Sequence, residues 1–275
     1  MKLPTIQPKT PSRDQLNISE DFFSVQAEGA TTGVPAYFVR LRGCNLLCGN
    51  PDMRSVYDKT NQDEIDAAKD SDATWVCDSI AVWLHGRRTP HAELEGRFAE
   101  AGQLENILEG RTHLIWTGGE PSLPHHRRSI MSFTDYLTNK HPGASLYTEL
   151  ETNGTQVIEQ PFARYINQIN CSPKLSNSAM PLSRRFNKDA LESIQQHPNH
   201  YFKFVVSTED DVLEAKRDFI EPLSIPHRNV ILMPGVNSQA DMPERTQFLY
   251  EMSKKHGYRG VTRGHVIAWD KVTGV

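Results

Sequence analysis

The sequence has no long apolar run, no excess of positive charge and few cysteines, and each absence excludes a class of protein. No stretch approaches the roughly 18 consecutive apolar residues of a membrane-spanning helix. The 30 Lys and Arg against 34 Asp and Glu give a net charge of −4, whereas proteins that bind nucleic-acid backbones are usually basic. Residues 1–17 are polar and lack the apolar core of a signal peptide. We therefore expect a cytoplasmic protein without direct membrane or nucleic-acid binding.

The sequence contains only four cysteines, too few for a disulfide scaffold in 275 residues. Cys44 and Cys48, with three residues between them, lie in a loop that follows an apolar run. Thiolates are soft ligands that suit zinc or iron–sulfur clusters, but two of them hold either group poorly. Cys77 is the best candidate for a third ligand. The spacing alone also allows the alternative that these are buried apolar thiols.

Strand-like and helix-like segments alternate along most of the chain, which indicates a mainly parallel sheet with helical crossovers. A barrel-type α/β domain fits the length, because a full (β/α)₈ barrel takes roughly 250 residues. The two first apolar runs, 21–26 and 36–41, flank a glycine-containing turn and predict a strand pair. Further strands are predicted at 79–84, 112–117, 145–151, 169–172, 201–206, 230–233 and 260–269.

Four of the predicted strands end in small or polar motifs. These are Thr117-Gly118-Gly119-Glu120-Pro121, Glu151-Thr152-Asn153-Gly154, Ser172-Pro173-Lys174 and Met233-Pro234-Gly235. Turns after strands need Gly, Asn and Pro for geometric reasons alone. However, three of these four turns also carry Glu or Lys, and ligands of parallel α/β folds bind at the carboxyl ends of strands. The motifs therefore favour a binding site at this edge.

In combination, segments 22–29, 38–46, 117–121, 151–155 and 172–174 resemble 7-carboxy-7-deazaguanine synthase, a branch of the radical S-adenosylmethionine (SAM) enzymes. The resemblance spans residues 18–275 and implies an α/β fold, a partial, modified (β/α) barrel, with residues 1–17 as an N-terminal arm. Most radical SAM enzymes carry Cys-x₃-Cys-x₂-Cys. Here Pro51 takes the third position and Cys77-Asp78-Ser79 matches the family's Cys-Asp-Thr, which implies an insertion at about residues 49–76. Ala27 replaces a family glycine, a change that is tolerated where φ is negative.

The resemblance also implies the cofactors. A [4Fe–4S] cluster would be held by Cys44, Cys48 and Cys77, which leaves one iron free to bind SAM. The Ser79 hydroxyl would bind Mg²⁺, a cation that takes oxygen ligands. No side chain is expected to be catalytic beyond the radical that the cofactors supply. Expected SAM contacts are Gly119, Glu120, Ser172, Pro173, Lys174, Met233 and Pro234.

The substrate implied by the resemblance is 6-carboxy-5,6,7,8-tetrahydropterin, which would be converted to 7-carboxy-7-deazaguanine with loss of ammonia. A carboxylate calls for a guanidinium, and Arg40 matches the family's residue for it. The terminal carboxylate of Val275 would accept hydrogen bonds from the aminopyrimidinone edge. Further expected contacts are Val25, Gln26, Ala27 and Thr117. The resemblance also implies a homodimer and an electron donor of flavodoxin or ferredoxin type.

Two other functions remain open at this stage. A radical SAM activase would cleave SAM only in the presence of a protein partner, but Arg40 and the Gln-x-Glu-Gly segment speak against it. A structural zinc protein is the second alternative, because Pro51 and the displaced Cys77 depart from the usual cluster motif. The sequence also leaves open whether the product feeds transfer-RNA or DNA modification.

Overall fold

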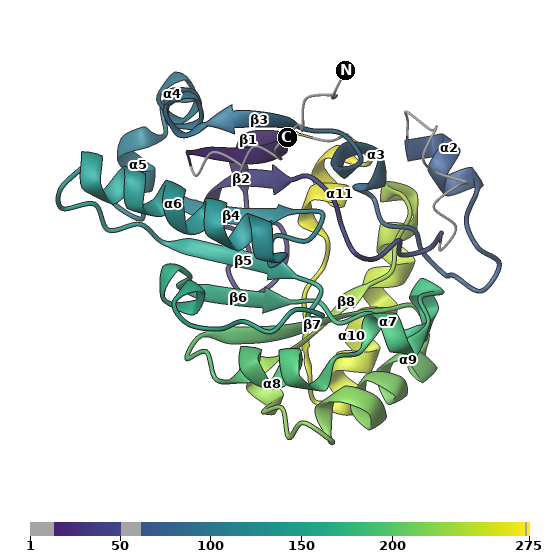
Figure 1. Cartoon of the computed structure of the whole chain (residues 1–275). Helices are drawn as coiled ribbons and strands as arrows, with labels where there is room; N and C mark the ends of the chain where they lie inside the picture. Colours follow the sequence, from purple (N-terminus) through teal and green to yellow (C-terminus); the bar gives the residue numbers. More distant parts are fainter. Residues whose placement is uncertain (1–13, 51–61, 273) are drawn as a thin grey trace, which may run out of the picture.

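The computed structural model describes residues 14–50, 62–272 and 274–275. Its nine strands form one sheet in the order β3-β1-β2-β4-β5-β6-β7-β8-β9 (Figure 1). The strands are β1 (Gln15–Val25), β2 (Pro35–Leu41), β3 (Arg87–Pro90), β4 (His113–Gly118), β5 (Thr148–Thr152), β6 (Gln168–Cys171), β7 (His200–Val206), β8 (Val230–Pro234) and β9 (Arg259–Gly260).

Most of the sheet is parallel. β1 pairs antiparallel with β2 and β3, and every neighbouring pair from β2 to β9 is parallel. Over the described ranges the sheet ends at β3 and at β9, so the barrel stays open. The prediction of a partial (β/α) barrel is therefore confirmed. The strand pair predicted at 21–26 and 36–41 is present as β1 and β2.

Helices cover the outer face of the sheet. The main core buries side chains of the strands against α4, α6, α8 and α10, with Trp116, Phe133 and Phe204 fully buried among them. No described helix is long and apolar enough to cross a membrane. The helices are α2 (Gln62–Ala67), α3 (Ile80–Trp83), α4 (His91–Glu100), α5 (Leu104–Leu108), α6 (Pro124–Lys140), α7 (Leu182–Arg185), α8 (Lys188–Gln195), α9 (Glu209–Glu214), α10 (Met242–His256) and α11 (Gly264–Trp269).

Two strand predictions are wrong. Segment 79–84 contains helix α3 instead, in which Ile80 and Trp83 are buried three residues apart on one face. A short apolar run does not distinguish a strand from a buried helical turn, and here the spacing of the buried residues decides. Segment 260–269 contributes only Gly260 to β9 and continues as α11, whose one buried residue is Val266.

The first described strand begins inside the segment expected to be an arm. Gln15, Leu16 and Asn17 belong to β1, and Leu16 is fully buried in the main core. Residues 1–13 of the predicted arm lie outside the described residues.

The predicted insertion packs against the cysteine loop. Residues 51–61, Pro51 included, lie outside the described residues. Of the rest, Ile65 and Trp75 form a second apolar cluster with Leu46, Cys48 and residues of α3. Figure 1 shows α2, α3 and α11 on the side toward which β2, β4 and β5 point, so this cluster lies at the carboxyl ends of the strands.

Candidate active site

A cavity of about 250 Å³ lies at the carboxyl ends of the parallel strands. Arg40 of β2, Thr117 of β4 and Glu151 of β5 line it from neighbouring strands, and Met233 of β8 lines it from the other end of the sheet. Ligands of parallel α/β folds bind at this edge. The position therefore agrees with the strand-end motifs of the sequence.

Three of the four cysteines share this cavity. Cys44, Cys48 and Cys77 line it, whereas Cys171 is fully buried elsewhere. Burial raises the pKa of each lining thiol, and that of Cys44 is raised further by Glu120, Cys48 and Cys77. All three lining cysteines belong to the second apolar cluster or pack against it. The amide of Cys77 donates to the carbonyl of Cys48 at 3.0 Å, so the displaced cysteine returns to the loop of the other two.

The donor set fits an iron–sulfur cluster. Each thiolate would bind one iron of a four-iron cluster, so three thiolates leave the fourth iron free for another ligand. Over the described ranges, no three His, Cys, Asp or Glu side chains converge on a point where one metal ion would bind. Thiolates are soft ligands that suit iron–sulfur clusters, and the three lining cysteines are the residues that would hold one.

The Gly118-Gly119 turn lies against the backbone of the cysteine loop. Gly118 has φ +106°, and a Cβ on Gly119 would lie 1.9 Å from the carbonyl oxygen of Gly43. The amide of Gly119 donates to Leu41 at 2.9 Å, and the amide of Glu120 donates to Gly43 at 2.9 Å. The glycines thus permit close approach of two backbones, and both also line the cavity.

Replacing Gly119 by alanine is expected to displace the cysteine loop. Because the added methyl group meets backbone atoms, the free energy of unfolding should fall by about 3 kcal/mol, and iron uptake should fall with it. Gly96→Ala in α4 is the control, since its Cβ would meet no atom within 4 Å. Urea unfolding and iron content measure both effects. Wild-type values for Gly119→Ala would contradict this role of the turn.

The residues expected to contact SAM divide into two groups. Gly119, Ser172, Lys174 and Met233 line the cavity, and the Lys174 ammonium donates to the Ser172 hydroxyl at 3.0 Å. Glu120 does not line it: this carboxylate is fully buried and accepts from the hydroxyl of Thr152 at 2.8 Å and from backbone amides. Glu120 therefore holds neighbouring turns together and does not face the cavity. Pro173 and Pro234 are buried outside the cavity lining.

All residues expected to contact the substrate line the cavity: Val25, Gln26, Ala27, Arg40, Thr117 and Val275. The Gln26 amide and the Thr117 hydroxyl donate to the two oxygens of Glu151, at 3.1 and 2.7 Å. Ala27 is absent from the described non-glycine residues with positive φ, so alanine fits this position.

Arg40 extends along the aromatic wall of the cavity. Its guanidinium lies 5.4 Å from the centroid of the Phe22 ring, and Phe22 stacks on Phe38 at 5.2 Å. Its Nε lies 3.4 Å from Glu20 without a well-formed hydrogen bond. The protein thus orients the Arg40 guanidinium, but its Nε has no hydrogen-bond partner among the described residues. Ser79 also lines the cavity, with its hydroxyl donating to Asp78 at 2.8 Å.

An ion network that the sequence did not reveal also lines the cavity. Arg263 donates to Glu28 at 2.9 Å and also pairs with Asp78, while Lys203 pairs with the other oxygen of Glu28. Burial raises the pKa of Glu28, but Lys203 and Arg263 outweigh this and hold it well below the usual value. His265 lines the same cavity, with its Nδ1 3.7 Å from Glu28.

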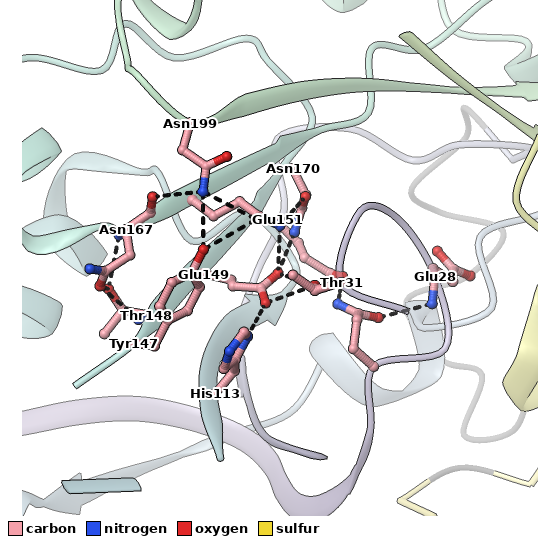
Figure 2. A network of polar contacts seen from close by, with 12 residues as sticks. Glu28, Thr31, His113, Tyr147, Thr148, Glu149, Glu151, Asn167, Asn170 and Asn199 are labelled. Carbon is pink, nitrogen blue, oxygen red and sulfur yellow. Dashed lines mark hydrogen bonds and ion pairs between the residues drawn. The ribbon is translucent and has the colours of Figure 1, made fainter. Parts of the chain in front are cut away.

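A second polar network anchors the loop between β1 and β2 (Figure 2). Glu149 is fully buried and accepts hydrogen bonds from Thr31 at 2.8 Å, Asn170 at 2.6 Å and Gln168 at 3.1 Å, with His113 Nδ1 at 2.6 Å. Thr31 belongs to the loop that carries Gln26, Ala27 and Glu28. The network therefore holds the loop between β1 and β2 to the inner face of the sheet.

Replacing Glu149 by alanine is expected to lower the free energy of unfolding by about 3 kcal/mol, because four polar groups, of which Gln168 and Asn170 are buried, lose their partner. Glu109→Ala is the control, since Glu109 is exposed and pairs with Arg111 at the surface. Urea unfolding of both variants measures the difference. Equal unfolding midpoints would show that the network is not needed for stability.

No protein-family model matches the sequence. The 7-carboxy-7-deazaguanine synthase of Pyrobaculum aerophilum is 29% identical over 262 residues, which cover 94% of this chain and 97% of that protein. The Halobacterium salinarum protein of that name is 28% identical over 276 residues, covering 93% and 91%. The crystal structure of QueE from Escherichia coli superimposes with a TM-score of 0.58 at 22% identity, covering 91% of this chain and 95% of that one. The similarity to these enzymes is thus confirmed across the chain.

Proposed function

We propose that this chain, which is related along its length to 7-carboxy-7-deazaguanine synthases, is a radical SAM lyase of the same activity. It would convert 6-carboxy-5,6,7,8-tetrahydropterin to 7-carboxy-7-deazaguanine with loss of ammonia. The observation that carries the proposal is that Cys44, Cys48 and Cys77 line the same cavity as Arg40 and Thr117. A cluster site and a site for a carboxylated polar heterocycle therefore share one enclosure.

Cys44, Cys48 and Cys77 would hold the [4Fe–4S] cluster, and Gly119, Ser172, Lys174 and Met233 line the space for SAM. When bound, the cluster and SAM together supply a 5′-deoxyadenosyl radical able to remove a hydrogen atom. The protein supplies position and excludes water around this reactive group. The Ser79 hydroxyl is an oxygen ligand suited to Mg²⁺, with the substrate's oxygens as further ligands.

The substrate would lie against the wall formed by β1, β2 and β4. Arg40 offers charge-assisted hydrogen bonds to its carboxylate, and the aromatic wall of Phe22 and Phe38 holds that guanidinium in place. The main chain at Val25–Ala27 and the hydroxyl of Thr117 are placed to bind the ring's polar edge. Val275 lines the same cavity and would complete this end of the site.

The proposal includes a homodimer and an electron donor of flavodoxin or ferredoxin type. A donor is required because the cluster must be reduced before SAM is cleaved. The chain is expected to act in the cytoplasm on a small molecule.

The test is anaerobic turnover. Reconstituted protein is incubated with SAM, Mg²⁺, dithionite and the carboxylated tetrahydropterin, and the products are separated by liquid chromatography with mass detection. Formation of the deazaguanine, with ammonia released in equal amount, supports the proposal. SAM cleavage that needs an added protein partner would favour the activase instead. A colourless protein that binds zinc and ignores SAM would overturn both.

A further inference from the structure

The segment around Cys77 must be held at the cavity by contacts with distant parts of the chain. Cys77 reaches the cavity only after the insertion, so its segment lacks the short tether that a Cys-x₂-Cys spacing would give. On one side it is well anchored: Gln62 donates to the carbonyl of Cys77 at 2.8 Å, and a Cβ on Gly49 would lie 2.4 Å from the Trp75 carbonyl oxygen. The cavity side is held by the side chain of Asp78.

We propose that Arg263 is a positioning residue that joins the displaced cysteine segment, through Asp78, to the substrate end of the cavity, through Glu28. The inference rests on the proposed function in taking Cys77 as a cluster ligand and the loop of Gln26 and Ala27 as a substrate contact. It adds a role for a residue that is neither a cluster ligand nor a substrate contact.

The geometry requires a guanidinium. Nε of Arg263 donates to Glu28 at 2.9 Å while Nη2 pairs with Asp78, so one planar group bridges two carboxylates that are 50 residues apart in the chain. The Arg263 side chain is 15% exposed, and its backbone continues this attachment, since the Gly264 amide donates to the Ala27 carbonyl at 3.0 Å. A lysine carries the charge but not the rigid fork.

The two halves of the bridge differ in burial. Glu28 is 15% exposed and also pairs with Lys203, whose side chain is 8% exposed, so removing a partner from this half leaves a buried charge less well compensated and destabilises the fold. Asp78 is 53% exposed because it faces the open cavity, and an exposed pair contributes little to stability. Ligands that fill the cavity cover Asp78, which strengthens its pairing with Arg263. We therefore expect loss of the Asp78–Arg263 ion pair to weaken ligand binding.

Helix α2 of the insertion and the segment after α11 also meet at the surface of the protein. Lys271, in the segment that follows α11, lies 3.4 Å from Asp63 and 3.5 Å from Asp66 of α2. These pairs are exposed and weak by themselves. They show, however, that helix α2 and the segment after α11 are neighbours. Arg263, which precedes α11, lines the cavity.

The experiment compares Arg263→Gln, Arg263→Lys, Asp78→Asn and the double variant Asp78→Asn/Arg263→Gln. Arg217→Gln is the control, an exposed arginine paired with Asp218 on π-helical residues 215–220. Three quantities are measured: the unfolding free energy without cofactors, the dissociation constant of the pterin for unreconstituted protein, and the SAM concentration that half-saturates the EPR change of the reduced cluster.

We expect Asp78→Asn to unfold like wild type but to need about fivefold more SAM. Arg263→Gln should lower stability and weaken both pterin and SAM binding about tenfold. Arg263→Lys should recover stability but not ligand affinity. The double variant should need no more SAM than Arg263→Gln, because both changes remove one interaction.

The proposal is overturned if Arg263→Gln loses stability while both affinities match the control, or if the Asp78 and Arg263 effects on SAM simply add. Should Arg263→Gln fail to fold, Arg263→Lys and Asp78→Asn decide the same question. Absence of pterin binding by the wild type would count against the proposed function, whereas the SAM titrations would still judge Arg263.

Discussion

The Cys77→Ala variant is expected to lose the cluster: after anaerobic reconstitution with iron and sulfide, it should bind little iron and show no SAM-responsive EPR signal when reduced. The reason is the number of ligands. Cys44 and Cys48 remain in the cavity, but two thiolates hold a four-iron cluster poorly. The variant should still fold, because Cys77 is a partly exposed side chain at the edge of a small apolar cluster.

Cys171→Ala is the matched control for this experiment. It makes the same chemical change at a fully buried cysteine that does not line the cavity, where the Sγ packs near Gly154. It should keep the iron and the EPR signal of the wild type, with a modest loss of stability from the small void. If Cys77→Ala retains a SAM-responsive cluster, the third ligand is another residue. If Cys171→Ala loses the cluster as well, the assignment of the three ligands is wrong.

Much of the site could be predicted because its residues lie in local motifs at strand ends. The strand before Gly118-Gly119 ends as predicted, and parallel pairing of β2, β4 and β5 then brings Arg40, Thr117 and Glu151 to one edge. The sequence could not show why the two glycines are needed. Their partner is the backbone of Leu41–Cys44, which lies more than 70 residues away in the chain.

The ion network was missed for a related reason. Lys203 lies in a strand between Phe202 and Phe204, and this alternation indicates that it faces away from the outer core. A charged residue in that pattern is ordinarily solvated, so its pairing with Glu28, 175 residues away, is visible only in the fold. Arg263 gives no local signal, since both of its carboxylate partners come from distant segments. Glu120 shows the opposite case: a motif residue whose buried hydrogen bonds make it part of the framework.

Arg40→Gln is expected to raise the KM for the pterin about 100-fold, since it removes a charge-assisted pair with a carboxylate in an enclosed site. Glutamine keeps polarity and much of the length but loses the charge and the paired donors. Because the thiols and the Gly119 turn are unchanged, iron content and the SAM-induced EPR change should match the wild type. Steady-state kinetics over a wide range of pterin concentration measure the effect.

Arg42→Gln is the control, because Arg42 lies two residues further along, is exposed and does not line the cavity. Its Nε donates to the Leu84 carbonyl at 3.2 Å, so its loss should leave the KM for the pterin near the wild-type value. A pterin analogue without the carboxylate sharpens the comparison: wild type and Arg40→Gln should bind it equally. If Arg40→Gln prefers the carboxylated substrate over that analogue as strongly as the wild type does, a group other than Arg40 binds the carboxylate. In that case the carboxylate lies elsewhere on the cavity wall, and the cations left to receive it are Lys174, Lys203 and Arg263.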